Sequence, residues 1–349
     1  MLGECFDRVR KCAPLVHSIT NYVTVNDVAN VLLACGGSPI MSDEPLDVEE
    51  ITALCGGLNL NIGTLHEKSI EGMLRAGKKS NEMGHPVLLD PVGAGASRFR
   101  TETAIRLMRE VRMAAVRGNI SEVRALAGAW DGVSGSCVSG GENEGDGIAA
   151  GTAVGNVGVM DAGSVSGGVR GVDVGVAAGI VAENIGVTDT GIVSGGKRGV
   201  DVGITSGRTR GVDADLADAV TEENLDGAVL FVREFARRTG CVTAVTGAID
   251  LVSDGDRCYV IRNGRPEMGR ITGTGCQLSG LMTAFLAANP GQPLEAAAAA
   301  VCAMGLAGEI GWSRMQEGDG NATYRNRIID AVYQMDGTAL EKGANYEIR

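Results

Sequence analysis

Hydrophobic and polar positions alternate along residues 14–128 in a way that indicates strands separated by helices. The apolar segments that predict strands are GSPIMS (37–42), LNLNIG (58–63), PVLLDPVG (86–93) and MAAVRGN (113–119). The segments with helical spacing are VNDVANVLLACG (25–36), LHEKSIEGMLRAGKKSNEMG (65–84) and TETAIRLMREVR (101–112). Strands that alternate with helices of this length predict βαβ units and a mainly parallel sheet covered by helices on both faces.

The same alternation resumes after about residue 213. A helix is predicted over 221–239, and it is followed by the strand CVTAVTG (241–247) and by a hairpin, LVSDGDRCYVIRNG (251–264). The run 277–288 again has apolar residues at helical spacing, and we expect helices to fill the remainder of the chain. The predicted fold class is therefore α/β.

Residues 131–212 differ from both flanking regions in composition. Glycine makes up 23 of these 82 residues, and the segment contains neither proline nor an aromatic residue. A 28-residue tandem repeat occupies 147–174 and 175–202, and a truncated third copy follows at 203–215. Such a segment buries too little area to offset its backbone entropy. We interpret it as a surface insertion at about 131–209, in short β-turns or disordered, within a single domain of 1–349; the alternative is a binding arm or an oligomer contact.

Charge and cysteine usage narrow the class of protein. The net charge is −12 and the isoelectric point is near 4.8, without a local basic cluster, which weighs against a nucleic-acid partner. The nine cysteines form no CxxC pair and only three histidines occur, so we expect neither a zinc site nor a disulfide framework. No uninterrupted apolar run approaches the roughly 18 residues of a membrane span, and the N-terminus lacks the apolar core of a signal peptide. We expect a cytoplasmic protein without a membrane partner.

The stretch RITGTGCQLSG (270–280) combines glycines, a cysteine and the start of a predicted helix. Gly273 and Gly275 allow a ligand to approach the main chain closely. A glycine turn that enters a helix presents unpaired N–H groups and the positive end of the helix dipole, which together form an anion site. At such a helix start the pKa of Cys276 is expected to lie below that of free cysteine. Alternatively, Cys276 is a reduced core cysteine beside a helix cap, and this stretch alone leaves both interpretations open.

Polar groups also follow two other predicted strands. Asp90, in DPVGAG (90–95), ends an apolar strand, where a carboxylate either holds Mg²⁺ through water or only forms a turn before proline. In RGNISE, Asn119 or Ser121 is expected to cap a helix that has Glu122 in its first turn. Capping does not explain Arg117, whose guanidinium is placed to contact phosphate oxygens.

A fourth strand end, AVTGAID (244–250), offers the hydroxyl of Thr246 and the bare backbone of Gly247 to a nucleotide. These four strand ends together predict phosphoryl transfer from Mg-ATP, in which the protein mainly positions groups and stabilises charge. The sequence contains no GxxxxGK[ST], which excludes a P-loop enzyme. The first strand is not followed by GxGxxG, which weighs against a dehydrogenase.

The combination HSITNYVTVNDVANVLLACGGSPIMS, NIGTL, LLDPVGAG, RGNISE, VTGAID and TGTGC resembles the hydroxyethylthiazole kinase family of the ribokinase-like superfamily. The motifs occur in family order and cover about 14–128 and 210–335; the segment 131–212 departs from the family pattern. The resemblance implies a ribokinase-like three-layer α/β/α fold. It also implies Mg²⁺-dependent phosphorylation by ATP of the hydroxyl of 4-methyl-5-(2-hydroxyethyl)thiazole, a step of thiamine salvage. Finally, it implies a homotrimer with active sites at the subunit interfaces.

The resemblance assigns roles to single residues. The substrate-binding positions match Met41, Asn26, Gly273 and Gly275. The ATP-binding positions match Arg117, Thr246, Gly247, Asp90 and Glu122, and the last two also match the metal positions. Cys276 matches the catalytic position where most ribokinase-like kinases have an aspartate base.

Two alternative functions remain open at this point. One is a ribokinase-like kinase of another small alcohol, such as the hydroxymethylpyrimidine, although Met41 and Cys276 favour the thiazole. The other is a non-catalytic scaffold that binds ligand and works through its repeat segment. The scaffold is disfavoured because the site residues are intact, namely Asp90, Arg117, Glu122 and Cys276.

Overall fold

The structure is a computed structural model that describes residues 1–131 and 219–349, so the predicted insertion lies outside the described residues. The described residues form one compact unit around a nine-stranded sheet with the order β2-β1-β3-β4-β5-β6-β7-β8-β9. Six strands are parallel, namely β1 (Leu15–Ile19), β2 (Ser38–Ile40), β3 (Gly57–Asn61), β4 (Val87–Asp90), β5 (Ala115–Gly118) and β6 (Val242–Val245). Three more continue the sheet in antiparallel pairs, namely β7 (Asp250–Ser253), β8 (Cys258–Ile261) and β9 (Tyr346–Ile348). Since β1–β6 run in one direction, their carboxyl ends meet at one edge of the sheet.

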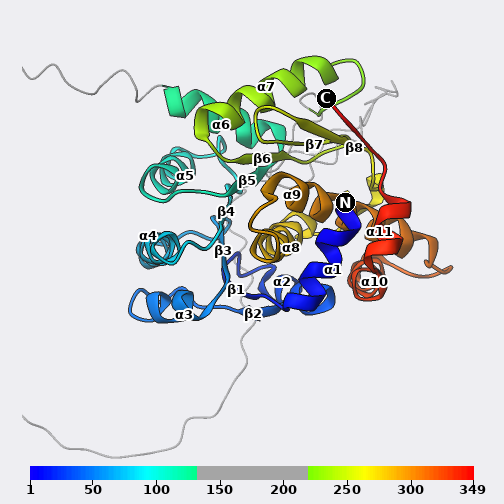
Figure 1. Ribbon diagram of the computed structural model, residues 1–349, viewed down its shortest axis with the longest axis horizontal. Coiled ribbons are helices and arrows are strands. Elements are labelled where there is room, and N and C mark those ends of the chain that lie inside the picture. The colour runs from blue at the N-terminus through cyan, green and yellow to red at the C-terminus, as the bar shows by residue number, and fades with distance from the viewer. Residues whose placement is uncertain (132–218) are drawn as a thin grey trace, which may run out of the picture. The chain divides into compact units, whose positions relative to one another are not determined.

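Helices cover both faces of this sheet (Figure 1). One layer contains α3 (Val48–Leu54), α4 (Glu67–Glu82), α5 (Arg98–Glu110), α6 (Ile120–Asp131) and α7 (Leu225–Thr239). The other contains α1 (Leu2–Cys12), α2 (Val25–Cys35), α8 (Thr274–Ala288), α9 (Pro293–Ser313), α10 (Asn321–Gln334) and α11 (Gly337–Gly343), with a short 3₁₀ helix, η2 (Pro266–Arg270), before α8. Along β4, Val87 and Leu89 pack into the first layer while Leu88 packs into the second. The predicted ribokinase-like three-layer α/β/α fold with a mainly parallel sheet is confirmed.

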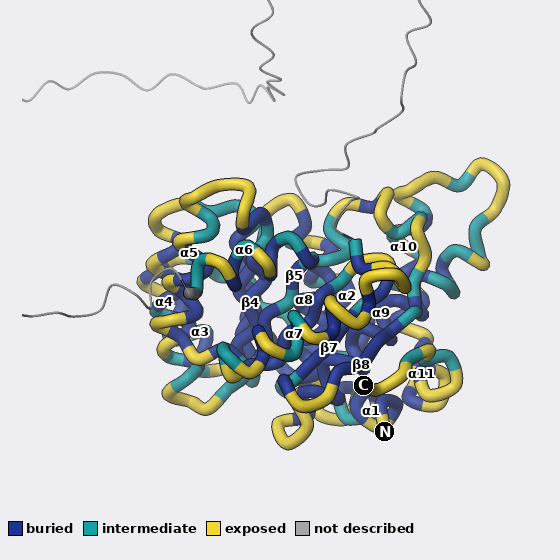
Figure 2. Tube along the Cα trace, turned by 90° about the horizontal axis from the view of Figure 1, so that it is seen from above, coloured by how far each residue is buried: buried dark blue, intermediate teal, exposed yellow. Residues whose placement is uncertain are grey.

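The central helices α8 and α9 lie deep in the second layer, within the buried interior visible in Figure 2. In the described part of the chain, α9 alone is long and apolar enough to cross a membrane, but 89% of its apolar window is buried inside the protein. This burial identifies α9 as a core helix, because a helix that is apolar on all sides is stable only when it is covered on all sides.

Most of the predicted helices and strands agree with the structure, and the differences are of three kinds. The strand β1 and the helices α1 and α3 were not predicted, although they are well defined. The predicted helix at 221–239 begins later, at Leu225, and the helix predicted from residue 277 begins earlier, at Thr274. The expectation that helices fill the end of the chain was wrong, because β9 pairs with β8 as an edge strand.

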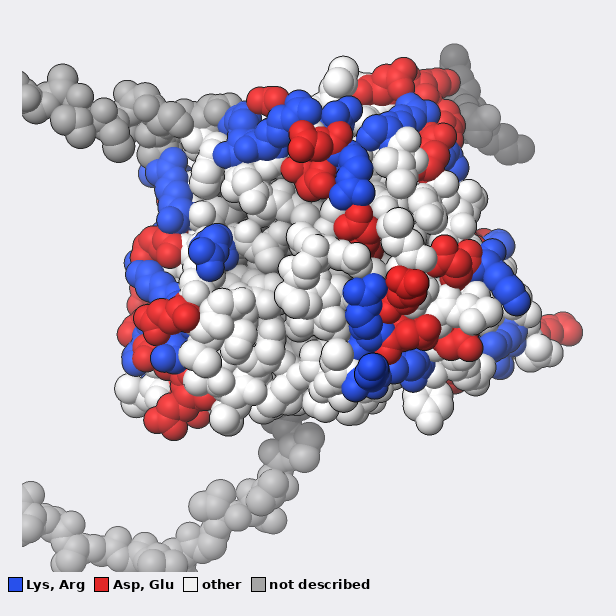
Figure 3. Space-filling model, in the orientation of Figure 1, with Lys and Arg blue, Asp and Glu red and all other residues white. Residues whose placement is uncertain are grey.

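Acidic and basic side chains lie next to one another along the top, the left side and the right-hand half of the face shown in Figure 3, and the area between them is largely uncharged. The described residues contain many ion pairs, for example Arg262 with Glu222 at 2.8 Å and Arg349 with Asp226 at 2.6 Å. The described residues therefore present no broad basic surface on this face.

Candidate active site

A buried hydrogen-bond network joins the end of β4 to the start of α8. Asp90 is fully buried, and its Oδ2 accepts hydrogen bonds from Asn61 Nδ2 at 2.7 Å and from Ser279 Oγ at 2.8 Å. The same Asn61 Nδ2 donates to Cys276 Sγ at 3.2 Å. Asn61 thus connects two of the predicted site residues, Asp90 and Cys276, which are 186 positions apart in the sequence.

The glycines of the GTGC motif create room at the first turn of α8. Gly273 has φ 83°, which glycine adopts without strain, and a Cβ on it would collide with Thr24. A Cβ on Gly275 would lie 2.5 Å from Arg117 Nη1. Both glycines are therefore required for close contacts at the helix N-terminus, where the backbone N–H groups favour an anion.

Arg117 lies at the centre of the candidate site. Its Nη1 is 3.6 Å from Asp90 Oδ1, and its Nη2 donates to Thr246 Oγ1 at 2.6 Å. The side chain is 12% exposed, so the guanidinium is largely removed from water but still accessible to a ligand. Because Arg117 also packs on Gly275, it joins β4, β5, β6 and α8.

Glu122 links the loop after β4 to the start of α6. Its Oε1 accepts from the Gly93 N–H and its Oε2 from the Asn119 N–H, both at 2.8 Å. Asn119 Oδ1 accepts from the Glu122 N–H at 2.8 Å in return, which is a capping box and confirms the predicted cap. Burial, followed by the negative charge of Asp90, raises the pKa of Glu122 from 4.5 to about 7. Two carboxylates therefore share one poorly hydrated region.

Asp250 is a further acidic group at this edge, and sequence analysis did not single it out. Its Oδ1 accepts from the Gly247 N–H at 2.8 Å and so fixes the turn that carries Thr246. Burial raises the pKa of Asp250 to about 7. Its position within the AVTGAID motif, four residues after Thr246, is the signal that was present in the sequence.

The expected acidity of Cys276 was wrong. Cys276 is 7% exposed, and burial together with the charge of Asp90 raises the pKa of its thiol to about 11. Hydrogen bonds from Thr24 and Asn61, and the positive charge of Arg117, offset this rise only in part. The helix N-terminus favours a thiolate, but burial beside a carboxylate outweighs that effect, so the resting side chain is a thiol at neutral pH.

The two substrate residues implied by the resemblance are less closely connected to this network. Met41 directly follows β2, is half-buried and packs against the core cluster that contains Cys276. Asn26 lies in the first turn of α2 with an exposed side chain, and its carbonyl oxygen accepts from Asn30 Nδ2 at 2.8 Å. The structure thus brings Asp90, Glu122, Arg117, Thr246, Gly247, Gly273, Gly275 and Cys276 to one edge of the sheet. Asn26 takes no part in that network.

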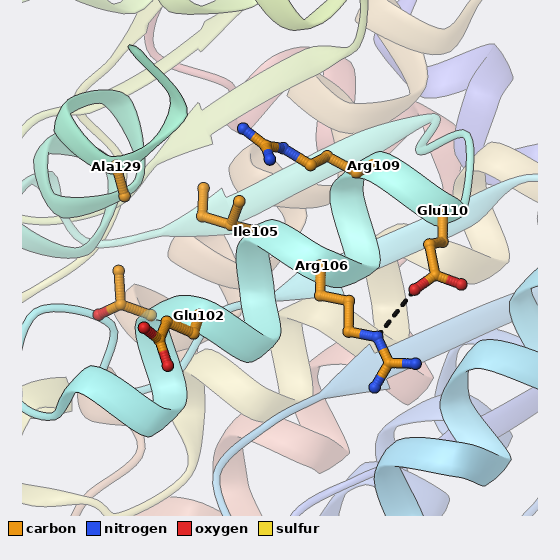
Figure 4. A pocket seen from close by; sticks show the side chains of 7 residues that line it. Glu102, Ile105, Arg106, Arg109, Glu110 and Ala129 are labelled. Atoms are coloured by element: carbon orange, nitrogen blue, oxygen red, sulfur yellow. Dashed lines mark hydrogen bonds and ion pairs between the residues drawn. The ribbon is translucent and has the colours of Figure 1, made fainter. Parts of the chain in front are cut away.

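A separate groove of about 330 Å³ runs along the outer side of α5 (Figure 4). It is lined by Thr101, Glu102, Ile105, Arg106, Arg109, Glu110 and Ala129. Within it Arg106 donates to Glu110 at 2.8 Å, and Arg109 lies over the Trp130 ring. None of the strand-end groups lines this groove, so it does not belong to the candidate active site.

The fold and the site together define a small-molecule kinase of the ribokinase-like class. Its charged and glycine-rich groups converge at the carboxyl ends of parallel strands, where open α/β sheets bind ligands. The model of the "HK: Hydroxyethylthiazole kinase family" matches residues 6–160 and 199–338, so the chain belongs to this family.

Individual relatives agree with the family match. A hydroxyethylthiazole kinase of Clostridium acetobutylicum is 43% identical over 347 residues, which cover 99% of this chain and 99% of the relative. One from Desulfovibrio desulfuricans is 36% identical over 353 residues, covering 99% and 97%. The solved structure of the hydroxyethylthiazole kinase protein from Pyrococcus horikoshii OT3 has a TM-score of 0.69 and 26% identity, and the alignment covers 100% of this chain and 98% of that chain.

Proposed function

We propose that this chain transfers the γ-phosphoryl group of ATP to the hydroxyl of 4-methyl-5-(2-hydroxyethyl)thiazole, a salvage step of thiamine biosynthesis. The observation that carries the proposal is the network in which Asn61 joins Asp90 to Cys276 beside Arg117. The carboxyl group of Asp90, the guanidinium of Arg117 and the thiol of Cys276 thus lie around the N-terminus of α8. This is a suitable environment for a phosphoryl group during its transfer.

The residues of the site suit a magnesium ion. Asp90 and Glu122 are both buried, and the charge of Asp90 contributes to the raised pKa of Glu122, so a cation would relieve their repulsion. The described residues contain no group of three or more His, Cys, Asp or Glu side chains that could hold a metal. Mg²⁺ typically uses one or two carboxylates together with water and substrate phosphates, so Asp90 and Glu122 could be its protein ligands. When bound, the ion would neutralise charge on the phosphate oxygens.

Two groups of residues would bind the nucleotide. Arg117 and the N–H groups at the start of α8 would hold phosphate oxygens, since Arg117 packs directly on Gly275. The turn at Thr246 and Gly247, fixed by Asp250, would contact the rest of the nucleotide. Met41 and, with less support from its position, Asn26 are assigned to the thiazole side.

In the proposed reaction, the alcohol oxygen forms a bond to the γ-phosphorus while the bond from that phosphorus to the β–γ bridging oxygen breaks. The proton of the alcohol passes to the Cys276 sulfur in its thiolate form, and the products are ADP and the phosphate ester. Because the pKa of the resting thiol is about 11, only a small fraction is thiolate at neutral pH. The rate of the base-assisted step therefore rises with pH.

We also propose a homotrimer with interfacial sites and a cytoplasmic location. The exposed apolar side chains Val23 and Leu46, which are 69% and 83% exposed, lie in loops at the substrate-side edge and support a subunit contact there. The eight cysteines of the described residues are all free thiols, which suits a reducing compartment. Light scattering of the purified protein tests the trimer directly.

The test of the function is an ADP-release assay on the purified chain with ATP and Mg²⁺. We expect turnover with hydroxyethylthiazole and at least tenfold lower kcat/KM with the hydroxymethylpyrimidine. A reversed preference would identify a kinase of the other alcohol. Absence of turnover with either alcohol would support the non-catalytic scaffold and contradict the proposal.

A further inference from the structure

Three loops at the substrate side of the sheet are joined by a small polar cluster, Tyr22, Asp43 and His66, which we call the loop clasp. Tyr22 follows β1, Asp43 follows β2 and His66 follows β3. The Tyr22 hydroxyl donates to Asp43 Oδ2 and lies 3.1 Å from His66 Nε2, which is itself 3.4 Å from Asp43 Oδ2. The Tyr22 and His66 rings stack, with centroids 6.2 Å apart. Side chains from three separate loops therefore meet at one point.

The hydrogen bonds of the loop clasp have a defined direction. His66 is the N-cap of α4, and its Nδ1 accepts from the Ser69 N–H at 3.2 Å. A ring nitrogen that accepts a hydrogen bond carries no proton, so the proton of the imidazole is on Nε2. Nε2–H donates to the Tyr22 oxygen, and the Tyr22 hydroxyl donates onward to Asp43. Each of the three side chains of the loop clasp therefore has a hydrogen-bond partner within the cluster, and these hydrogen bonds fix its orientation.

Each of the three loops carries a group that the proposed reaction uses on its acceptor side. The first loop contains Thr24, which packs on Gly273 and hydrogen-bonds the Cys276 thiol. The second begins at Met41, the proposed thiazole contact. The third follows Asn61, the last residue of β3, which donates to the Cys276 sulfur and whose Oδ1 accepts from the Gly63 N–H at 2.9 Å.

The strand order separates these loops from the nucleotide groups. The clasped loops follow β2, β1 and β3, which are neighbours at one end of the sheet. Arg117 lies near the end of β5 and Thr246 follows β6, with β4 between the two sets. A disturbance of the loop clasp is therefore expected to reach the acceptor side before it reaches the nucleotide side.

We propose that Tyr22, Asp43 and His66 are positioning residues that hold these three loops in register and thereby set the affinity for the acceptor alcohol. The kinetic part of the inference rests on the proposed function, because it assumes that the alcohol binds beside Met41 and Cys276. The structural part of the inference is independent of the proposed function. Removal of the Tyr22 hydroxyl is expected to increase the mobility of all three loops whatever the substrate is.

The experiment compares Tyr22→Phe with the wild-type chain. The substitution removes only the hydroxyl of a side chain that is 56% exposed, so the fold should be retained. Loss of a hydrogen bond to a charged partner predicts a rise of about 5- to 50-fold in KM for hydroxyethylthiazole. The KM for ATP should stay within about twofold, as expected when one bound substrate is affected selectively.

Two further variants sharpen the test. His66→Asn keeps a strong N-cap residue but lacks the Nε2–H, so it should reproduce the effect of Tyr22→Phe on KM for the alcohol. The double variant Tyr22→Phe/His66→Asn should add little to either single change, since both break the same chain of hydrogen bonds. Tyr333→Phe, at a tyrosine on α10 that is 66% exposed, is the matched control and should leave both KM values unchanged.

Hydrogen exchange at residues 20–24, 41–47 and 62–66 provides a readout that needs no substrate. Faster exchange in all three loops of Tyr22→Phe, together with the selective rise in KM, supports the inference. An unchanged KM for the alcohol, an equal rise in both KM values, or faster exchange confined to 20–24 would overturn it. If the wild-type chain shows no turnover, the proposed function fails separately, and exchange in the three loops still decides whether the loop clasp exists.

Discussion

The substitution Glu122→Gln removes a charge from a buried position while preserving the shape of the side chain. Glu122 is 6% exposed, and burial with the nearby charge of Asp90 raises its pKa from 4.5 to about 7. A difference of this size corresponds to about 3 kcal/mol between the two protonation states. Below about pH 7 the Glu122 carboxyl of the native state is therefore mostly protonated.

The sign of the pH dependence follows from linkage. In the unfolded chain Glu122 loses its proton near its ordinary pKa of 4.5, whereas in the native chain it keeps that proton until about pH 7. Its contribution to stability is complete below pH 4.5 and is lost as pH rises through about 7. Glutamine does not titrate, so the wild-type chain should lose about 3 kcal/mol of unfolding free energy relative to the variant between pH 4 and pH 8.

The assay is urea unfolding of both proteins without divalent cations, followed by circular dichroism at several pH values. Titrating groups that do not interact with Glu122, including Asp250, are common to both proteins and cancel in the difference. The control is Glu102→Gln, at an exposed residue that pairs with Arg98. Its unfolding free energy should differ from that of the wild-type chain by an amount that stays constant with pH to within about 0.5 kcal/mol. A wild-type-minus-Glu122→Gln difference that is constant with pH, or that grows with pH, would refute the reasoning.

Changes at three other places in the chain test separate parts of the account. Cys276→Ala should lower kcat by about 10²–10⁴-fold, whereas Cys276→Asp should retain or raise kcat. Burial raises the pKa of the Cys276 thiol to about 11. The kcat of the wild-type chain should therefore increase from pH 7 to pH 9, while the kcat of Cys276→Asp should not. Full turnover by Cys276→Ala would instead assign catalysis to the glycine turn. Arg117→Lys should weaken binding of a fluorescent ATP analogue by at least about tenfold, since lysine cannot replace a bidentate guanidinium. Deletion of 161–198, which lies outside both family-matched ranges, should leave the turnover rate within about twofold of the wild-type value. If light scattering showed that the deletion variant had lost the trimer, the segment would instead be needed for assembly.

Much of the fold could be predicted because its parallel strands are buried on both faces. Such strands appear as short apolar runs between helices, as VLLD and AVRG do at β4 and β5. The strand β1, LVHSI, was missed because buried His17 and Ser18 interrupt its apolar pattern. The strand β9 was missed because it has only three residues at a sheet edge and is largely exposed.

The candidate site could be assembled from sequence only where a strand end carries a charge or a glycine. Asp90, Arg117 and Thr246 meet because the carboxyl ends of parallel strands lie at one edge. Ser279 was hidden because α8 is buried on nearly all sides, so its polar residues do not mark a side of the helix that faces solvent. Asn61 was hidden inside an apolar strand in the same way.

The pKa of Cys276 illustrates the limit of local reasoning. A sequence motif shows the helix start and therefore the favourable dipole, but it does not show how much water the fold removes or which charge it brings near. Both opposing influences, burial and Asp90, come from segments far away in the chain.

The central claim is that this site phosphorylates hydroxyethylthiazole, and phosphorus NMR of the reaction mixture tests it most directly. With the purified chain, ATP, Mg²⁺ and hydroxyethylthiazole, we predict a new phosphomonoester resonance that grows in proportion to ADP and is missing when the alcohol is omitted. Formation of ADP with inorganic phosphate alone, or persistence of ATP, would contradict the account.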